Sequence, residues 1–128
     1  MESLSPNIFV KDMQATIDFY TILGFQVTMS VPEENKEGFV WCAMTNGNVQ
    51  LMFQTYESLA SNLPQISRQD GGSLLLYISV KNIRDLFQRI QDKVFVLQEL
   101  NKTFYGATEF AISDINSYVL VFAEHEAA

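Results

Sequence analysis

The sequence predicts an α+β fold in which two βαβββ modules form a curled mixed sheet around a concave pocket. The first observation is a repeat, because the apolar and helix-capping positions recur when the chain is shifted by 70 residues. The second is the order of patterns within each half, where a strand, a helical segment and three strand-like runs follow one another. The repeat aligns Ile8, Val10, Lys11, Asp12 and Met13 with Ile78, Val80, Lys81, Asn82 and Ile83.

The first module opens with a strand at residues 7–10. Asp12 follows it, at a position where a side-chain oxygen can accept a free N–H of the first helical turn. Gly24 is placed to end the helix, because glycine readily takes the left-handed conformation found there. The helix between them carries its apolar residues at Met13, Ile17, Tyr20 and Leu23.

Three strands complete the first module, and they are expected at residues 25–31, 38–44 and 48–54. Asn46-Gly47 lies between the last two and is typical of a two-residue hairpin turn. The only cysteine, Cys42, falls in the middle strand within an apolar run. We expect a buried structural thiol there, and a reactive thiol is the alternative.

The second module repeats this order. Its first strand is expected at residues 74–80, and Asn82 stands at the helix-capping position. The helix has apolar residues at Ile83, Leu86, Phe87 and Ile90, which is the spacing of one helical face. The last three strands are expected at residues 93–100, 107–113 and 117–123.

We expect residues 1–128 to form a single domain, with module one at about 1–56, a joint at about 57–72 and module two at about 73–125. A short helix is predicted at residues 56–63 in the joint. Each half alone would bury little surface and be marginally stable, which favours two halves that share one core and one concavity. The pairing of modules within one chain or between two chains stays open.

The amino-acid composition indicates a folded protein and argues against several classes of partner. Hydrophobic residues make up 48% of the chain and charged residues 18%, which is typical of a folded protein. Eight basic against 15 acidic residues give a net charge of −7, which argues against nucleic acid or an anionic membrane as partner. No apolar run is long enough to span a membrane, and the first residues lack the pattern of a secretory signal. One cysteine excludes an intrachain disulfide, and we expect a cytoplasmic protein.

Short motifs in both halves resemble the vicinal oxygen chelate superfamily, which includes glyoxalases, bleomycin-resistance proteins and extradiol dioxygenases. In the first half the resemblance lies in Val10-x-Asp12, Phe19-Tyr20 and Leu23-Gly24-Phe25. The resemblance implies two βαβββ modules and leaves the chemistry open, since one fold hosts many functions. In the second half it lies in Phe104-Tyr105-Gly106, Glu109-Phe110, Asp114 and the run from Tyr118 to Phe122.

Enzymes of that superfamily hold a divalent metal with one His, Gln or Glu side chain from each of four strands. According to the resemblance, the residues of this chain at the four metal-ligand positions are Ser5, Gln50, Leu75 and Val121. Leucine and valine cannot coordinate a metal, and serine and one glutamine make a poor ligand set. The only histidine, His125, is expected in a solvated or frayed C-terminal tail. We therefore expect no metal and no cofactor, as in the metal-free members related to bleomycin-resistance proteins.

The same positions outline a candidate ligand site. Side chains alternate along a strand, so neighbours of the metal positions two residues away share their face. We expect a small planar molecule, neutral or cationic, and a homodimer whose second copy covers strand edges. Trp41 lies on the neighbouring strand, where either Trp41 or its neighbours Val40 and Cys42 face the site. The predicted ligand-binding residues are Ser5, Asn7, Trp41, Gln50, Met52, Leu75, Tyr77 and Val121.

Three functions remain open. The first is a metal-free protein that binds or sequesters a small molecule, and the sequence favours it over an enzyme. The second is an enzyme of the same fold, a lyase, isomerase or dioxygenase relative, with an atypical metal site or with acid–base work by Glu109 or Tyr77. The third is a structural or interaction module whose concavity is filled by its own side chains. A structural role is preferred for Glu109 over an acid–base one.

Overall fold

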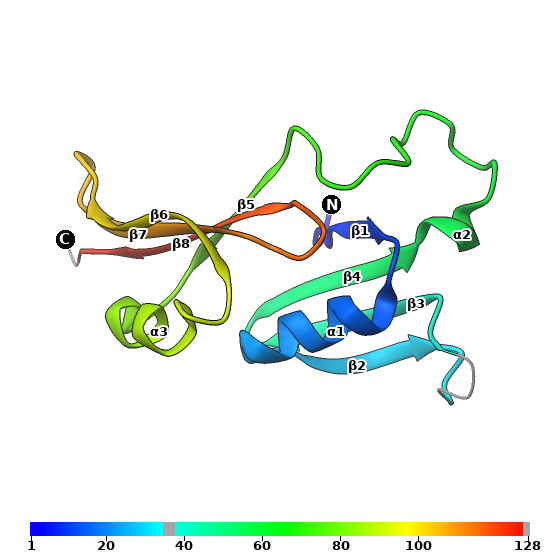
Figure 1. The fold of residues 1–128 in the computed structure, drawn as a ribbon, viewed down its shortest axis with the longest axis horizontal. Helices are drawn as coiled ribbons and strands as arrows, with labels where there is room; N and C mark the ends of the chain where they lie inside the picture. Colours follow the sequence, from blue (N-terminus) through cyan, green and yellow to red (C-terminus); the bar gives the residue numbers. More distant parts are fainter. Residues whose placement is uncertain (35–37, 127–128) are drawn as a thin grey trace. The chain divides into compact units, whose positions relative to one another are not determined.

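The computed structural model describes residues 1–34 and 38–126. The chain divides into two compact units, Met1–Asp70 and Gly71–Ala128 (Figure 1). Each unit contains one βαβββ module with a four-stranded mixed sheet, which confirms the predicted fold class. No helix in the described part of the chain is long and apolar enough to cross a membrane.

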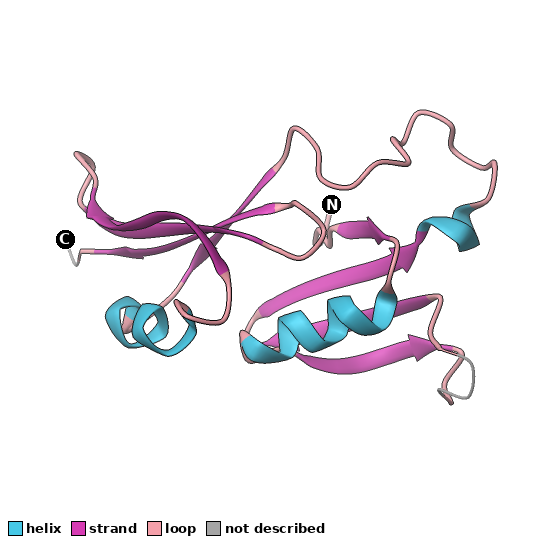
Figure 2. Ribbon diagram, in the orientation of Figure 1, coloured by secondary structure: helices cyan, strands magenta, loops and turns pink. Residues whose placement is uncertain are grey.

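The first unit has a sheet in the order β1-β4-β3-β2. β1 runs parallel to β4, and the other neighbours are antiparallel. The helix α1 lies along one face of this sheet, as Figure 2 shows. The elements are β1 (Asn7–Val10), α1 (Met13–Ile22), β2 (Gln26–Val31), β3 (Trp41–Asn46), β4 (Val49–Thr55) and a short α2 (Tyr56–Leu59).

The ends of α1 follow the sequence prediction. Asp12 accepts a hydrogen bond from the backbone N–H of Ala15 at 3.0 Å and so caps the helix. Gly24 has a φ of +98°, and a Cβ there would lie 3.0 Å from the Asn46 side chain. The helix buries Tyr20 against Phe53 on the sheet, with ring centroids 4.8 Å apart. The predicted cap and the predicted glycine end are both confirmed.

The hairpin between β3 and β4 differs from the prediction by one residue. Asn46 pairs with Val49, so the two turn residues are Gly47 and Asn48 rather than Asn46 and Gly47. The Asn46 side chain donates to the Leu23 carbonyl at 3.2 Å, which ties this residue to the end of α1. Gly47 takes the positive φ of +59° that the turn requires.

The second unit repeats the arrangement, with the strand order β5-β8-β7-β6 and a parallel pair formed by β5 and β8. α3 covers one face of the sheet, where Phe87 meets Phe110 with ring centroids 5.0 Å apart. Phe110 in turn stacks on Phe122 of the neighbouring strand at 5.1 Å. The elements are β5 (Leu75–Ser79), α3 (Ile83–Ile90), β6 (Phe95–Lys102), β7 (Ala107–Ser113) and β8 (Val119–His125).

The cap of α3 is not the predicted one. Asn82 has a left-handed backbone with a φ of +56°, and its side chain makes no capping hydrogen bond. The carboxylate of Glu124 accepts instead from the backbone N–H groups of Asn82 and Ile83, both at 3.1 Å. A residue from the last strand therefore caps the helix, because β8 lies beside the point where α3 begins.

The predicted joint is largely folded onto the first unit. Its helix is shorter than predicted, because Ala60 follows α2 with a positive φ of +52°. The guanidinium of Arg68 donates to four carbonyl groups of the segment before it, and Asp70 lies 3.6 Å from the Lys11 ammonium. The four carbonyl acceptors belong to Ala60, Asn62, Leu63 and Ile66.

Candidate functional site

In each unit the helix covers one face of the sheet, and the candidate site residues lie on the other. In the first unit, Ile8, Cys42 and Phe53 point into the core beneath α1. Their neighbours along the strands point the opposite way, since side chains alternate. Asn7 pairs with Met52 in the parallel ladder, and Trp41 pairs with Gln54 in the antiparallel one. The face opposite α1 thus brings together three predicted residues, Asn7, Trp41 and Met52.

A chain of side-chain hydrogen bonds orders this face. The indole N–H of Trp41 donates to Asn7 Oδ1 at 3.2 Å, and Asn7 Nδ2 donates to Gln54 Oε1 at 3.0 Å. Gln54 Nε2 then donates to Ser58 Oγ at 3.2 Å. We call Asn7, Trp41 and Gln54 the indole network. It orients the plane of the Trp41 ring, which is only partly buried.

Two further predicted residues lie nearby. Gln50 is exposed on β4 and pairs with Thr45, four residues before Gln54 on the same strand. Ser5 is exposed just before β1 begins. The sequence reasoning missed Gln54, although the alternation of Gln50, Met52 and Gln54 along one strand was a signal that could have found it.

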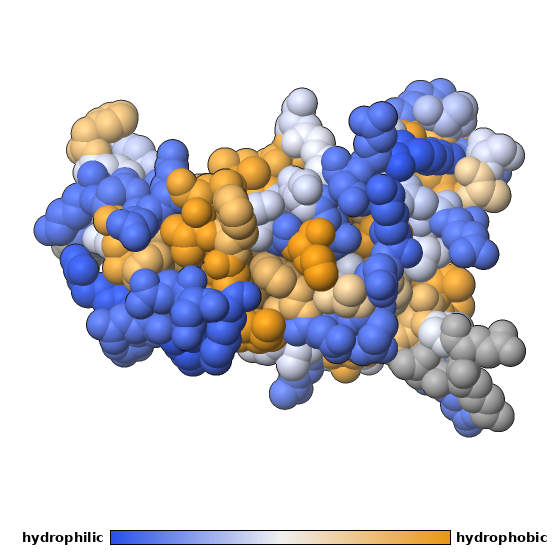
Figure 3. Space-filling view, viewed as in Figure 1, coloured by the Kyte–Doolittle hydropathy of each residue, from blue (hydrophilic) through white to orange (hydrophobic). Residues whose placement is uncertain are grey.

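In the second unit the face opposite α3 carries the remaining predicted residues. Leu75 and Tyr77 are 49% and 47% exposed on β5, and Val121 pairs with Tyr77 and is buried. Figure 3 shows apolar surface over the strands of this unit, beside the hydrophilic outer side of α3. The apolar and aromatic character expected of the face is therefore present in both units.

A carboxylate on this face is bound by two tyrosines. Glu109 Oε2 accepts hydrogen bonds from the hydroxyls of Tyr77 and Tyr105, both at 2.6 Å. The Tyr77 hydroxyl oxygen also lies 3.1 Å from His125 Nε2. We call these four residues the Glu109 cluster. They come from β5, β7, β8 and the turn before β7, and the predicted set contained only Tyr77.

The hydroxyl proton of Tyr77 is donated to the Glu109 carboxylate. The Tyr77 oxygen can then accept a hydrogen bond from His125 in the tautomer that carries its proton on Nε2. The hydrogen bond to Glu109, followed by desolvation and the negative charge of the carboxylate, raises the pKa of Tyr77 and of Tyr105. Both phenols consequently stay protonated near neutral pH.

The prediction of a solvated or frayed tail at His125 is right about the exposure of the side chain and wrong about fraying. β8 continues to His125, which pairs with Ala107 of β7. The next residue, Glu126, is still bonded through its N–H to the Gly106 carbonyl at 2.8 Å. These ladder bonds hold the imidazole in place beside Tyr77, although the side chain remains exposed.

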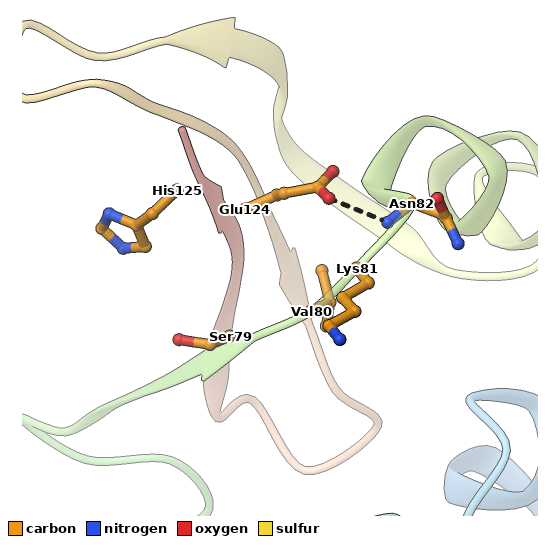
Figure 4. A pocket seen from close by; sticks show the side chains of 6 residues that line it. All are labelled: Ser79, Val80, Lys81, Asn82, Glu124 and His125. Carbon is orange, nitrogen blue, oxygen red and sulfur yellow. Dashed lines mark hydrogen bonds between the residues drawn. The ribbon is translucent and has the colours of Figure 1, made fainter. Parts of the chain in front are cut away.

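A shallow surface pocket lies where β5 passes into α3 (Figure 4). Glu124 points across it toward the start of α3, where its carboxylate is engaged as the helix cap. His125 points to the opposite side of the strand, toward the Glu109 cluster. The lining residues are Ser79, Val80, Lys81, Asn82, Glu124 and His125.

The residues do not fit a resident metal ion. Among the described residues, no group of three or more His, Cys, Asp or Glu side chains could hold one. Two of the four positions inferred from the family resemblance, Leu75 and Val121, carry no donor atom. Cys42 is buried against Met13, with 3.7 Å between the two sulfurs, and burial raises its thiol pKa to about 11. The thiol is therefore structural, as the preferred prediction had it.

Comparison with known proteins places the chain in one family. The model of the Glyoxalase/Bleomycin resistance protein/Dioxygenase superfamily matches residues 4–122. TioX from Micromonospora sp. ML1 is similar in structure, with a TM-score of 0.76 and 15% identity over 98% of this chain and 100% of that one. A glyoxalase/bleomycin resistance protein/dioxygenase family enzyme from Burkholderia phytofirmans PsJN has a TM-score of 0.76 and 21% identity, covering 95% and 97% of the two chains.

A third similar structure is a bleomycin-binding protein in complex with bleomycin. Its TM-score is 0.67 at 16% identity, and the match covers 98% of this chain and 100% of that chain. Identities this low establish the shared fold and not a shared ligand. No curated protein matches the sequence.

Proposed function

Because the chain belongs to the Glyoxalase/Bleomycin resistance protein/Dioxygenase superfamily, we propose that it is a metal-free small-molecule binding or sequestering protein of the bleomycin-resistance type. The observation that carries the proposal is the indole network on the sheet face opposite α1. A hydrogen-bonded indole beside an apolar methionine and amide groups is a surface suited to a planar molecule.

The fixed orientation of Trp41 favours binding over simple core packing. Its N–H is held by Asn7, while Asn7 is itself held by Gln54, so little side-chain freedom is lost when a ring stacks on the indole. Met52 lies beside Asn7 and offers an adaptable apolar contact. Gln50 adds exposed polar groups that can orient a ligand.

The residues at the metal positions support a function without metal. A divalent metal would find no set of strong ligands at these four positions, Ser5, Gln50, Leu75 and Val121. A bleomycin-binding protein of similar fold has been solved in complex with bleomycin, so this fold can bind a small molecule. We propose the same general mode for this chain, with a planar neutral or cationic ligand in keeping with its net charge of −7.

A second candidate is an enzyme that uses the Glu109 cluster for acid–base chemistry. The observation in its favour is the pair of 2.6 Å hydrogen bonds that joins Glu109 to Tyr77 and Tyr105. The raised pKa of Tyr77 argues against the phenolate as a base near neutral pH. The cluster therefore suits binding better than proton abstraction by a tyrosine.

Titration of the purified protein with a library of planar compounds tests the proposal. We expect saturable quenching of Trp41 fluorescence that is unchanged by a strong chelator, with the compound recovered unaltered after incubation. Binding that requires an added divalent metal would contradict the metal-free function. Chemical turnover of a bound compound would favour the enzyme instead.

A further inference from the structure

The Glu109 cluster places three rings close to one another beside one carboxylate. The Tyr77 ring lies 6.1 Å from the His125 ring, and the Tyr105 ring lies 6.4 Å from it, measured between centroids. Phe104 extends this wall, with its ring 5.0 Å from that of Tyr105 in an edge-on arrangement. Tyr77 and Tyr105 are 47% and 50% exposed, so ring surface is open to solvent around the carboxylate.

The carboxylate is fixed but not neutralised. Both tyrosine hydroxyls bind the same oxygen, Oε2 of Glu109, and they are neutral donors. The two ion pairs found within the described residues join Lys11 to Asp70 and Lys102 to Glu126, so neither involves Glu109. The only ionisable nitrogen in the cluster, on His125, contacts Tyr77. The site consequently presents a negative charge beside two half-exposed tyrosine rings.

We propose that the Glu109 cluster binds an organic cation, an alkylated ammonium group, between its carboxylate and the surrounding rings. A carboxylate attracts the charge, and tyrosine rings stabilise a weakly hydrated cation through their negative faces. This inference goes beyond the proposed function, because it assigns a separate site in the second unit and names the chemical class of its ligand. An anion is disfavoured by Glu109, and a small metal ion lacks a ligand set in the described residues.

The residues of the Glu109 cluster have different roles in binding a cation. Glu109 supplies the negative charge, and Tyr77 and Tyr105 fix its orientation while offering ring surface. His125 is a positioning residue, because its Nε2 lies 3.1 Å from the Tyr77 hydroxyl oxygen. All of these groups belong to the second unit, so the site requires no element of the first.

The test compares choline with its uncharged isostere, 3,3-dimethylbutan-1-ol, on the full chain. Ring signals of Tyr77 and Tyr105 are followed by nuclear magnetic resonance at constant ionic strength, after assignment with Tyr→Phe variants. We expect choline to shift these signals and to bind about fivefold more tightly than the isostere, which is the upper range for an exposed ionic interaction. Equal binding of the two probes, or shifts that map elsewhere, would overturn the inference.

A matched pair of variants assigns the charge effect to one residue. Glu109→Gln removes the charge with little change in shape and should abolish the preference for choline. Glu99→Gln makes the same change in net charge at an exposed position on β6 and should leave the preference intact. Choline binding that survives Glu109→Gln would reject the proposal. The comparison of probes on the unmodified protein still decides the matter if the Glu109 variant does not fold.

The outcomes separate this inference from the proposed function. If planar neutral compounds quench Trp41 while choline leaves the tyrosine signals unmoved, the cation site is rejected and the binding function stands. If choline binds at the tyrosines in a charge-dependent way and no planar compound quenches Trp41, the cation site is supported and the proposed role of the indole network fails.

Discussion

Trp41 is the chain's only tryptophan, and the structure ties its indole N–H to Asn7 on the sheet face opposite α1. Removing a stacked aromatic anchor often costs about 2 kcal/mol or more of binding free energy. We therefore expect Trp41→Ala to weaken binding of a planar ligand by roughly 30-fold or more. Calorimetric titration of wild type and variant measures the change, since the variant has no tryptophan fluorescence.

Gln50→Ala is the matched control on the same face. One neutral hydrogen bond contributes only about 1 kcal/mol, so this variant should lose less affinity than Trp41→Ala. A Trp41→Ala protein that binds as well as wild type would place the ligand away from the indole network.

Glu109 sets the ionisation of its two tyrosine partners. Since its hydrogen bond and its charge raise the pKa of Tyr77 and Tyr105 above the usual 10, Glu109→Gln should lower both values toward 10. A pH titration followed by the ultraviolet absorbance of phenolate measures these pKa values directly. Glu99→Gln should leave the titration unchanged, and an identical curve for Glu109→Gln would contradict the hydrogen-bonded cluster.

The raised pKa of the two tyrosines also makes the free energy of unfolding depend on pH. A tyrosine whose pKa is higher in the folded state favours folding while it is protonated, so its contribution is complete below pH 10, the usual pKa. The contribution is lost as the pH rises from there through the raised pKa. Both tyrosines are half exposed, and solvent therefore weakens the effect.

At the scale of residues, sequence reasoning identified side chains but not their partners. Side chains alternate along each strand, and this alternation can be read from the local sequence. It therefore predicted the shared face of Asn7, Trp41 and Met52. The contact between Tyr77 and Glu109 depends on β8 lying between β5 and β7, which no local pattern reveals. The order of His125 was missed for the same reason, because it comes from pairing with Ala107 and not from its own neighbours.

At the scale of elements, the cap of α3 offers a clear test. Glu124 accepts from two backbone N–H groups at the start of this helix. Loss of a helix cap typically costs about 1 kcal/mol, and Glu124→Ala should lower the free energy of unfolding by that amount. Chemical denaturation of both proteins measures it.

The control for the cap is Glu126→Ala, two residues further along the chain. Glu126 is exposed and its carboxylate is 3.9 Å from the Lys102 ammonium, so its removal should change stability by less than about 0.5 kcal/mol. Equal losses in the two variants would mean that charge, and not the cap, explains the effect of Glu124.

The elements themselves were largely predictable, since periodicity, caps and turn residues are encoded locally. β1 and β7 have the predicted bounds, and α1 begins and ends as Asp12 and Gly24 indicate. The errors arose where a distant group replaced a local signal. Glu124 takes the capping role expected of Asn82, and the bond from Asn46 to Leu23 accompanies a turn that begins one residue later than predicted.

At the scale of the whole molecule, metal content distinguishes the proposed function from its main alternative. The set Ser5, Gln50, Leu75 and Val121 cannot bind a divalent ion tightly. We expect protein purified without a histidine tag to contain far less than one equivalent of nickel, zinc, iron or manganese by elemental analysis. Near-stoichiometric metal that survives dialysis would contradict this prediction.

We also predict a homodimer. β2 and β6 are edge strands of their sheets, and both expose apolar side chains. Exposed apolar residues on an open strand edge favour association with a second copy. Light scattering at micromolar concentration should give twice the chain mass of 14.6 kDa, and a monomer would contradict the prediction. The residues are Met29 and Val31 on β2 and Phe95 and Leu97 on β6.

The pairing of first with last strands affects how the chain is made. β1 has β4 as its neighbour and β5 has β8, so the opening strand of each module leaves the ribosome long before its partner is synthesised. The three later strands can form consecutive hairpins at once, whereas docking of the first strand must wait for closure of a long loop. A nascent or truncated chain that stops before Val119 exposes both β5 and β7 as unpaired edges. Those incomplete chains are where the protein is most vulnerable to aggregation.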